Sequence, residues 1–517
     1  MCEPPIARPS PAKLAAMPWW VWASWGAGVG APLLLALWLW TRSLATRRRA
    51  DGPENHRRAD NGLPPEADPR DKWYRRTLTN PWTWVVVAFV VFCAFALWVQ
   101  YFLQYASLSA SISSQLKDAG QPPQILGQDA FNQALIHVTG YAALTLGAYV
   151  LLFLLVDRWR PSPPSMKLVA LAWGACAATF FAVFINSWMG QLLAAGASGE
   201  DIANNAAAVF VAPFVEEACK ASVLFILVMA MRRRVVSVIQ MIGLSGLAAA
   251  GFAFVENIIY YVQVYCTASL VVGPQADDYL HQMVLMRGVY TSFGHPLFTM
   301  MTAFGLICGL RQRSKLARVM CPLTGYLIAA LLHMCFNGLA TFMDDYRVLV
   351  MFGIMVILGV VGWLAGQFMA QKRVIAWRLD DYVRMGWLRD RDAAVYPALL
   401  SRLKLTVAGW LRGWRIGKAT VRLMSDVTEL AYIRQGVVTG TIDQGAQGRE
   451  HELVVDALAL RGIALDEPDG LRIVPRYRGP AAWHNFKAWL AARAAKRTSQ
   501  WDAPVAAPAG VPVPWMS

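Results

Sequence analysis

The sequence contains few charged residues. Asp, Glu, Lys and Arg make up 16% of it, whereas soluble domains carry about 25%, so an ordinary soluble enzyme is excluded. The 56% of hydrophobic residues excludes a disordered chain. The eight cysteines include no C-x-x-C pair, which argues against a disulfide framework and against a thiolate zinc site. We find no glycine-rich phosphate loop and no internal repeat.

Long apolar runs are abundant instead, and they predict an all-α polytopic membrane helix bundle. A helix needs about 20 residues to cross a hydrocarbon core of ~30 Å. Nine runs are long enough, and their predicted ranges are 18–41, 82–104, 135–156, 167–195, 206–231, 236–265, 284–310, 319–343 and 347–370. Trp and Tyr gather at several of their ends, as they do in the aromatic belts at membrane interfaces.

The loops between these runs alternate in charge. Lys and Arg are concentrated in every second loop, for example at 232–234 and 311–318. The intervening loops, at 105–134, 196–205 and 266–283, carry almost none. Because cytoplasmic loops are rich in Lys and Arg, we predict nine spans with the N-terminus outside and the C-terminus inside. The net charge of +15 then reflects membrane topology, and we expect no nucleic-acid partner.

Composition divides the chain into four predicted parts. They are two N-terminal spans with their loops, a seven-span core, a small cytoplasmic helical domain and a disordered tail rich in Pro and Ala, at 1–134, 135–370, 371–502 and 503–517. In the third part, 396–411 and 449–461 have amphipathic helical spacing. Its basic excess, which includes Arg412 and Arg415, suits either contact with anionic lipid headgroups or a solvated helical face.

Ionisable residues inside the predicted spans are the most informative feature. Glu216, Glu217 and Lys220 lie within one apolar run, and Glu256 lies within the next. Each costs ~2.5–3.5 kcal/mol at the centre of a membrane helix, so the four together cost on the order of 10 kcal/mol before any pairing. That approaches the whole stability of a typical domain. A functional site is therefore the default interpretation.

Glu216, Glu256, His295 and His333 lie at one common depth, about ten residues below the external ends of their spans. At ~1.5 Å per residue this is about 13–17 Å below the outer boundary. We therefore expect four helices to present them to one polar cavity. Carboxylates can accept a proton from water, and with imidazoles they form the ligand set of a catalytic zinc. His333 and Asn337, on one helix face, could instead donate hydrogen bonds to an oxyanion.

At these residues the sequence resembles the PrsW family of intramembrane proteases, within the superfamily of CAAX-prenyl and Abi proteases. The match consists of an E-E-x-x-K motif, an F-x-x-x-E-N motif and two histidine motifs in the expected order. The residues that carry it are Glu216, Glu217, Lys220, Phe252, Glu256, Asn257, His295, Thr299, His333 and Asn337. The resemblance covers roughly 135–370.

This resemblance implies a multi-pass endopeptidase of the bacterial inner membrane that cuts a membrane-protein or peptide substrate. PrsW-like proteins are associated with cleavage of an anti-sigma factor on its extracytoplasmic side. The superfamily is classed both as metalloproteases and as glutamate proteases, so a zinc cofactor is one of two possibilities.

With this resemblance in view, we assign roles to the motif residues as a hypothesis. Glu216 is the expected general base, oriented by Glu217 and Lys220, and Asn337 is expected to stabilise the oxyanion. The residues expected to hold a zinc ion or the catalytic water are Glu256, His295 and His333.

Two other functions fit the same residues. A proton-coupled transporter also places Glu and His at the midplane, but it usually has inverted repeats. A non-catalytic scaffold of protease descent would tolerate loss of the glutamate pair, which is intact here. The simplest structural interpretations are an ion pair between the glutamates and Lys220 or the arginines at 232–234, and interhelical hydrogen bonds for the histidines. The sequence leaves the oligomeric state open.

Overall fold

The computed structural model describes residues 81–118, 126–156, 164–196, 205–231, 238–271, 275–310, 314–342, 346–439 and 445–469, with a few residues between and after these ranges. Within them every regular element is a helix. The larger elements are α6 (Pro81–Asp118), α7 (Gln128–Val156), α8 (Pro164–Ala172), α9 (Thr179–Gly196), α11 (Ala212–Met231), α12 (Val238–Val271), α13 (Ala276–Met283), α14 (Gly294–Leu310), α15 (Lys315–Phe342) and α16 (Tyr346–Arg384). The predicted first span, 18–41, and the tail at 503–517 lie outside the described residues.

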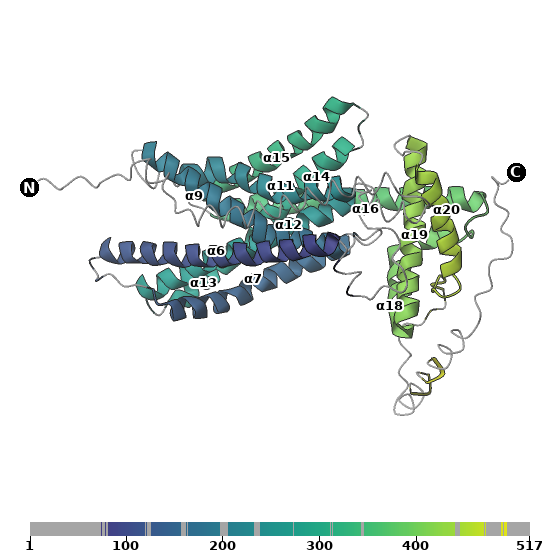
Figure 1. Cartoon of the computed structure of the whole chain (residues 1–517), viewed down its shortest axis with the longest axis horizontal. Helices are drawn as coiled ribbons and strands as arrows, with labels where there is room; N and C mark the ends of the chain where they lie inside the picture. The colour runs from purple at the N-terminus through teal and green to yellow at the C-terminus, as the bar shows by residue number, and fades with distance from the viewer. Residues whose placement is uncertain are drawn as a thin grey trace, which may run out of the picture.

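Seven of the described helices are long and apolar enough to cross a membrane, and they extend along the long axis of the molecule in Figure 1. The predicted span at 206–231 is also helical, but α11 is 20 residues long and contains Glu216, Glu217 and Lys220. Because of these three charged residues, α11 is not among the seven candidate membrane spans. The all-α membrane bundle is thus confirmed, while the total of nine spans and their orientation stay predictions.

Helix α12 forms the centre of this bundle. Most of its side chains are buried, and it contacts α7, α8, α11 and α14. Its backbone also approaches a π-helical segment, η2 (Trp173–Ala178), very closely. A Cβ atom added to Gly251 would lie 2.1 Å from the carbonyl oxygen of Leu171, and one added to Gly174 would lie 1.8 Å from that of Ala248. Glycine at these positions lets the two helices meet backbone to backbone.

Gly251→Ala should therefore destabilise the bundle. The added methyl group meets a carbonyl oxygen that cannot rotate away, so α12 has to shift, and we expect a loss of about 1–3 kcal/mol. Gly147→Ala in α7 is the matched control, because nothing lies within 4 Å of its added Cβ. Thermal unfolding of the purified protein in detergent measures both variants, and equal melting temperatures would contradict this account of the packing.

The C-terminal part of the chain forms a separate helical bundle. It consists of the end of α16 with α17 (Asp392–Val395), α18 (Leu399–Arg412), α19 (Trp414–Thr439) and α20 (Gly445–Leu460). Its core includes Leu379, Tyr382 and Leu423. The helices predicted at 396–411 and 449–461 are confirmed as α18 and α20.

The boundary expected at residue 370 falls inside α16, which continues to Arg384 without a break. The apolar run ends near Lys372, but the residues that follow still favour a helix. Phe368 packs against the apolar cores of both bundles. One helix therefore joins the two parts directly.

Candidate active site

The acidic motif forms an ion-paired cluster on α11. Lys220 is completely buried, and its Nζ lies 2.9 Å from Oε1 of Glu217 and 3.4 Å from Oε2 of Glu216. The spacings i, i+3 and i, i+4 bring the three side chains to one face of the helix. The ion pair expected from the sequence is thus present, but it lies within a single helix. Hydrogen bonds to residues of other helices connect this cluster to the neighbouring spans.

Glu217 makes those contacts. Thr299 of α14 donates a hydrogen bond of 2.8 Å to its Oε2, and Nδ1 of His333, on α15, lies 3.1 Å from its Oε1. The His333 ring stacks on Phe298 with centroids 4.9 Å apart. Because Glu217 is fully buried and all its partners are polar, it holds α11, α14 and α15 together at the level of the motif.

His295, at the start of α14, links the cluster to α12. Its Nδ1 lies 2.9 Å from Nζ of Lys220, and its Nε2 lies 2.7 Å from Oε2 of Glu256. An ammonium group can only donate, so Nδ1 accepts from Lys220. In the neutral ring Nε2 therefore carries the proton and donates it to Glu256.

Arg287 is a site residue that the sequence pattern did not single out. It lies in the π-helical segment η4 (Val284–Tyr290), and its Nη2 donates to Oε2 of Glu256 at 2.7 Å. Its Nε donates to Oδ1 of Asn257 at 3.3 Å, and its guanidinium group lies 3.8 Å from the ring centroid of Tyr260. A signal was present in the sequence, because Arg287 is the only Lys or Arg between Arg234 and Arg311.

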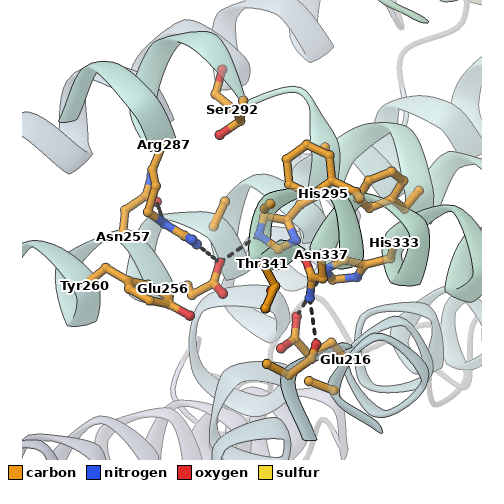
Figure 2. A pocket seen from close by; sticks show the side chains of 18 of the residues that line it. Glu216, Glu256, Asn257, Tyr260, Arg287, Ser292, His295, His333, Asn337 and Thr341 are labelled. Atoms are coloured by element: carbon orange, nitrogen blue, oxygen red, sulfur yellow. Dashed lines mark hydrogen bonds and ion pairs between the residues drawn. The ribbon is translucent and has the colours of Figure 1, made fainter. Parts of the chain in front are cut away.

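Glu216, Glu256, Arg287, His295 and His333 line one cavity of about 220 Å³. In Figure 2 the carboxylate of Glu256 lies between Arg287 and His295, and Glu216 and His333 lie beyond the imidazole. Asn337 also lines the cavity. The sequence-based expectation that four spans meet at one polar cavity is thus matched by the structure, with α11, α12, α14 and α15 each contributing a residue.

Three of the side chains could hold a metal ion together. One donor atom from each of Glu216, His295 and His333 lies within 4.8 Å of the other two. The set expected from the sequence contained Glu256 in place of Glu216. Glu256 is not in this group, and its Oε2 already contacts the guanidinium of Arg287 and the ring of His295. Glu216 thus lies in the candidate metal group, and Glu256 contacts the outer edge of that group through His295.

Asn337 also differs from its expected surroundings. Its Nδ2 donates a hydrogen bond of 2.9 Å to the carbonyl oxygen of Ala208, which lies in the π-helical segment η3 (Ala207–Val211) ahead of α11. This bond ties α15 to the start of the helix that carries Glu216. Its role at an oxyanion stays a prediction.

Comparison with known families agrees with this geometry. Residues 162–364 match the family model of the PrsW family intramembrane metalloproteases. This part of the chain is a PrsW-family domain. The match falls within the range predicted from the motifs and contains the four helices that carry the motif residues of the cavity, α11, α12, α14 and α15. No curated protein and no solved structure matches the chain.

The donor atoms of this PrsW-family domain fit the metal that the family description implies. A ligating histidine usually donates its second ring N–H to a carboxylate or a carbonyl group. The Nδ1 of His333 faces Glu217, which leaves its Nε2 available for a metal. The Nε2 of His295 faces Glu256 and its Nδ1 accepts from Lys220, so a metal at Nδ1 of His295 would have to replace the hydrogen bond from Lys220. Two imidazoles and one carboxylate form a ligand set known from catalytic zinc sites.

Arg287→Lys should lower cleavage by the PrsW-family domain about 10–100-fold. Lysine keeps the positive charge but cannot bind Glu256 and Asn257 with the same fixed geometry. We therefore expect Glu256 to lose its orientation toward His295 while the thermal stability in detergent changes little. Turnover and metal affinity of the purified variant test this positioning role. Wild-type turnover in Arg287→Lys would contradict it.

Proposed function

We propose that this protein is an intramembrane endopeptidase that hydrolyses a peptide bond in a membrane-protein substrate by means of a water molecule at Glu216. The observation that carries the proposal is the meeting of Glu216, His295 and His333 at one cavity inside the helix bundle. The match of residues 162–364 to a family of intramembrane metalloproteases supports it.

Each residue at the cavity has a separate role in this proposal. Glu216 accepts the proton of the attacking water, because its carboxylate lines the cavity and points at both histidines. Glu217 and Lys220 lie behind it and hold its charge and position. Glu256, fixed by Arg287, orients the ring of His295. Asn337 lines the cavity and has an amide N–H available for a developing oxyanion.

In a zinc-dependent version of the reaction, Glu216 would hold the ion together with His295 and His333, and its role as the proton acceptor belongs to the metal-free version. When bound, such an ion makes its water more acidic and polarises the scissile carbonyl group. The protein's own contribution is the fixed pair of imidazoles and the carboxylates that orient them.

The size of the cavity restricts the form of the substrate. The cavity of about 220 Å³ is small beside an α-helix, which is about 10–12 Å across with its side chains. The substrate therefore enters as a short extended segment and has to unwind locally. The depth of the motif in the predicted topology favours cleavage toward the outer face, as for an anti-sigma-factor-like substrate of a bacterial inner membrane.

The full-length protein, reconstituted in lipid nanodiscs with a single-span substrate, tests the proposal. We expect one or a few cuts, located by mass spectrometry, within or at the edge of the substrate's apolar segment. A zinc chelator should stop cleavage and added Zn²⁺ should restore it. Cys335→Ala is the matched control, since Cys335 is exposed two residues from His333 and should leave cleavage unchanged.

Other outcomes separate the alternatives. Cleavage that survives chelation would remove zinc from the proposal and leave the glutamate chemistry. A protein that moves protons or solutes across liposomes but never cuts would be a transporter, and one that does neither but binds membrane proteins would be a scaffold. Both of these results would overturn the proposed function.

A further inference from the structure

One helix of the C-terminal bundle has an apolar face with no protein packed against it in the described part of the chain. On α18 the outward side chains include Leu400, Leu403 and Leu411, which are 82%, 60% and 58% exposed. The three leucines recur at helical spacing. Trp410 borders this face, but its ring packs against Gly417 and Trp414 at the start of α19. An exposed apolar face of this kind marks an interaction surface.

The opposite face of α18 already has its partner. Leu405, Ala408 and Gly409 are buried, and α18 packs against α19. The fold of the bundle therefore does not need the outward face. Its exposed leucines therefore call for a partner outside the C-terminal bundle.

The position of α18 in the molecule favours the membrane surface as that partner. In Figure 1, α18 runs across the direction of the spanning helices and lies nearer to the membrane bundle than α19 and α20 do. Because α18 packs against α19, its exposed leucines face away from α19. Phe368 packs in both cores, so the C-terminal bundle begins directly where α16 leaves the bilayer.

Basic residues accompany this face. Lys404 and Arg412 lie on α18, and Arg415 and Lys418 follow on the first turns of α19. Burial, together with the positive charge of Arg412, lowers the pKa of Arg493, so positive charge accumulates at this end of the bundle. A helix that combines Leu on one side with Lys and Arg at its border is typical of segments that lie in the plane of a membrane interface.

We propose that α18 is an in-plane membrane anchor whose apolar face inserts into the leaflet that α16 leaves at its C-terminal end, and that Lys404, Arg412, Arg415 and Lys418 bind anionic phospholipid headgroups there. Each such cation contributes about a fivefold gain in lipid affinity. The anchor fixes the C-terminal bundle against the bilayer. This proposal does not depend on the proposed catalytic function.

Photo-crosslinking of the full-length protein in nanodiscs tests the anchor. The photoreactive residue p-benzoylphenylalanine replaces Leu403 in one variant and Val455 in the control. Val455 is 49% exposed on α20, the helix farther from the membrane bundle in Figure 1. In discs with phosphatidylglycerol we expect lipid adducts at position 403 to exceed those at 455 at least about fivefold, as measured by mass spectrometry.

The charge requirement has its own test. Discs of phosphatidylcholine alone, or a variant with Gln at Lys404, Arg412, Arg415 and Lys418, should lower the adducts at position 403 about fivefold or more. Equal yields in neutral and anionic discs would overturn the recognition of anionic lipid. Adducts to the chain's own residues around Trp489, or equal lipid yields at 403 and 455, would overturn the anchor, provided that the melting temperatures of all variants match the wild type.

Discussion

Glu216→Gln is expected to reduce peptide-bond cleavage by about 10²–10⁴-fold while the fold is retained. The amide has the shape of the carboxylate, so its bond with Asn186, 3.4 Å from Oε1, can be re-formed. Lys220 keeps Glu217 as a partner at 2.9 Å. The substitution removes the group that accepts the proton of water and weakens the donor set formed with His295 and His333. The cleavage rate should therefore fall strongly, while the stability of the fold should change little.

Three measurements on the same preparation check this. Product formation should fall by the stated factor, the melting temperature should stay close to that of the wild type, and the bound metal should decrease. Glu256→Gln provides the comparison, because Glu256 acts through His295 in our assignment and should cost only about 10–100-fold. If Glu256→Gln were the more severe variant, or if Glu216→Gln cleaved normally, the roles that we assign to the two glutamates would be wrong.

Lys220→Met is expected to destabilise the bundle by about 3–5 kcal/mol. It removes a buried cation that lies within 3.4 Å of both Glu216 and Glu217. Two adjacent carboxylates then remain in a low-dielectric interior without their counter-ion. Thermal unfolding in detergent should show a large fall in melting temperature, together with a lower yield of folded protein.

A second pair in the same chain provides the control. Arg384 and Asp380 also form an i, i+4 ion pair, but their side chains are exposed, and breaking it with Arg384→Met should cost less than about 1 kcal/mol. The double variant Glu217→Gln with Lys220→Met should recover part of the lost stability, because it also removes one of the two buried carboxylates left without a counter-ion. Losses that simply add would show that the pair is not coupled.

Much of this site could be predicted because charged residues inside a membrane span carry a large free-energy cost. Glu216, Glu217, Lys220 and Glu256 are conspicuous in apolar runs, and a bilayer tolerates such groups only when they face one another. The common depth of the histidines follows from helical rise alone. The helix bundle, the meeting of four spans and the family could therefore be inferred before any coordinates were known.

The pairing inside the cavity could not be inferred in the same way. Which glutamate lies in the group formed with the two histidines depends on rotations of α11 and α12 that no periodicity specifies. Arg287 lies in a π-helical segment, where the 3.6-residue spacing fails and a side chain is re-aimed. The continuation of α16 beyond the bilayer could not be predicted from hydropathy either. Hydropathy indicates where the apolar run ends, but the helix does not end there.

The unbroken α16 also couples two parts of the molecule in rotation. Each residue of an α-helix turns the chain by about 100°, so one residue inserted near Lys372 would swing everything beyond it by more than a quarter turn about the helix axis. The number of residues in this connector is therefore fixed, because adding or removing even one would change the rotation of one bundle relative to the other. This holds although the side chains at that point are mostly exposed. Evolutionary insertions there should come in multiples that restore the angle, or be absent.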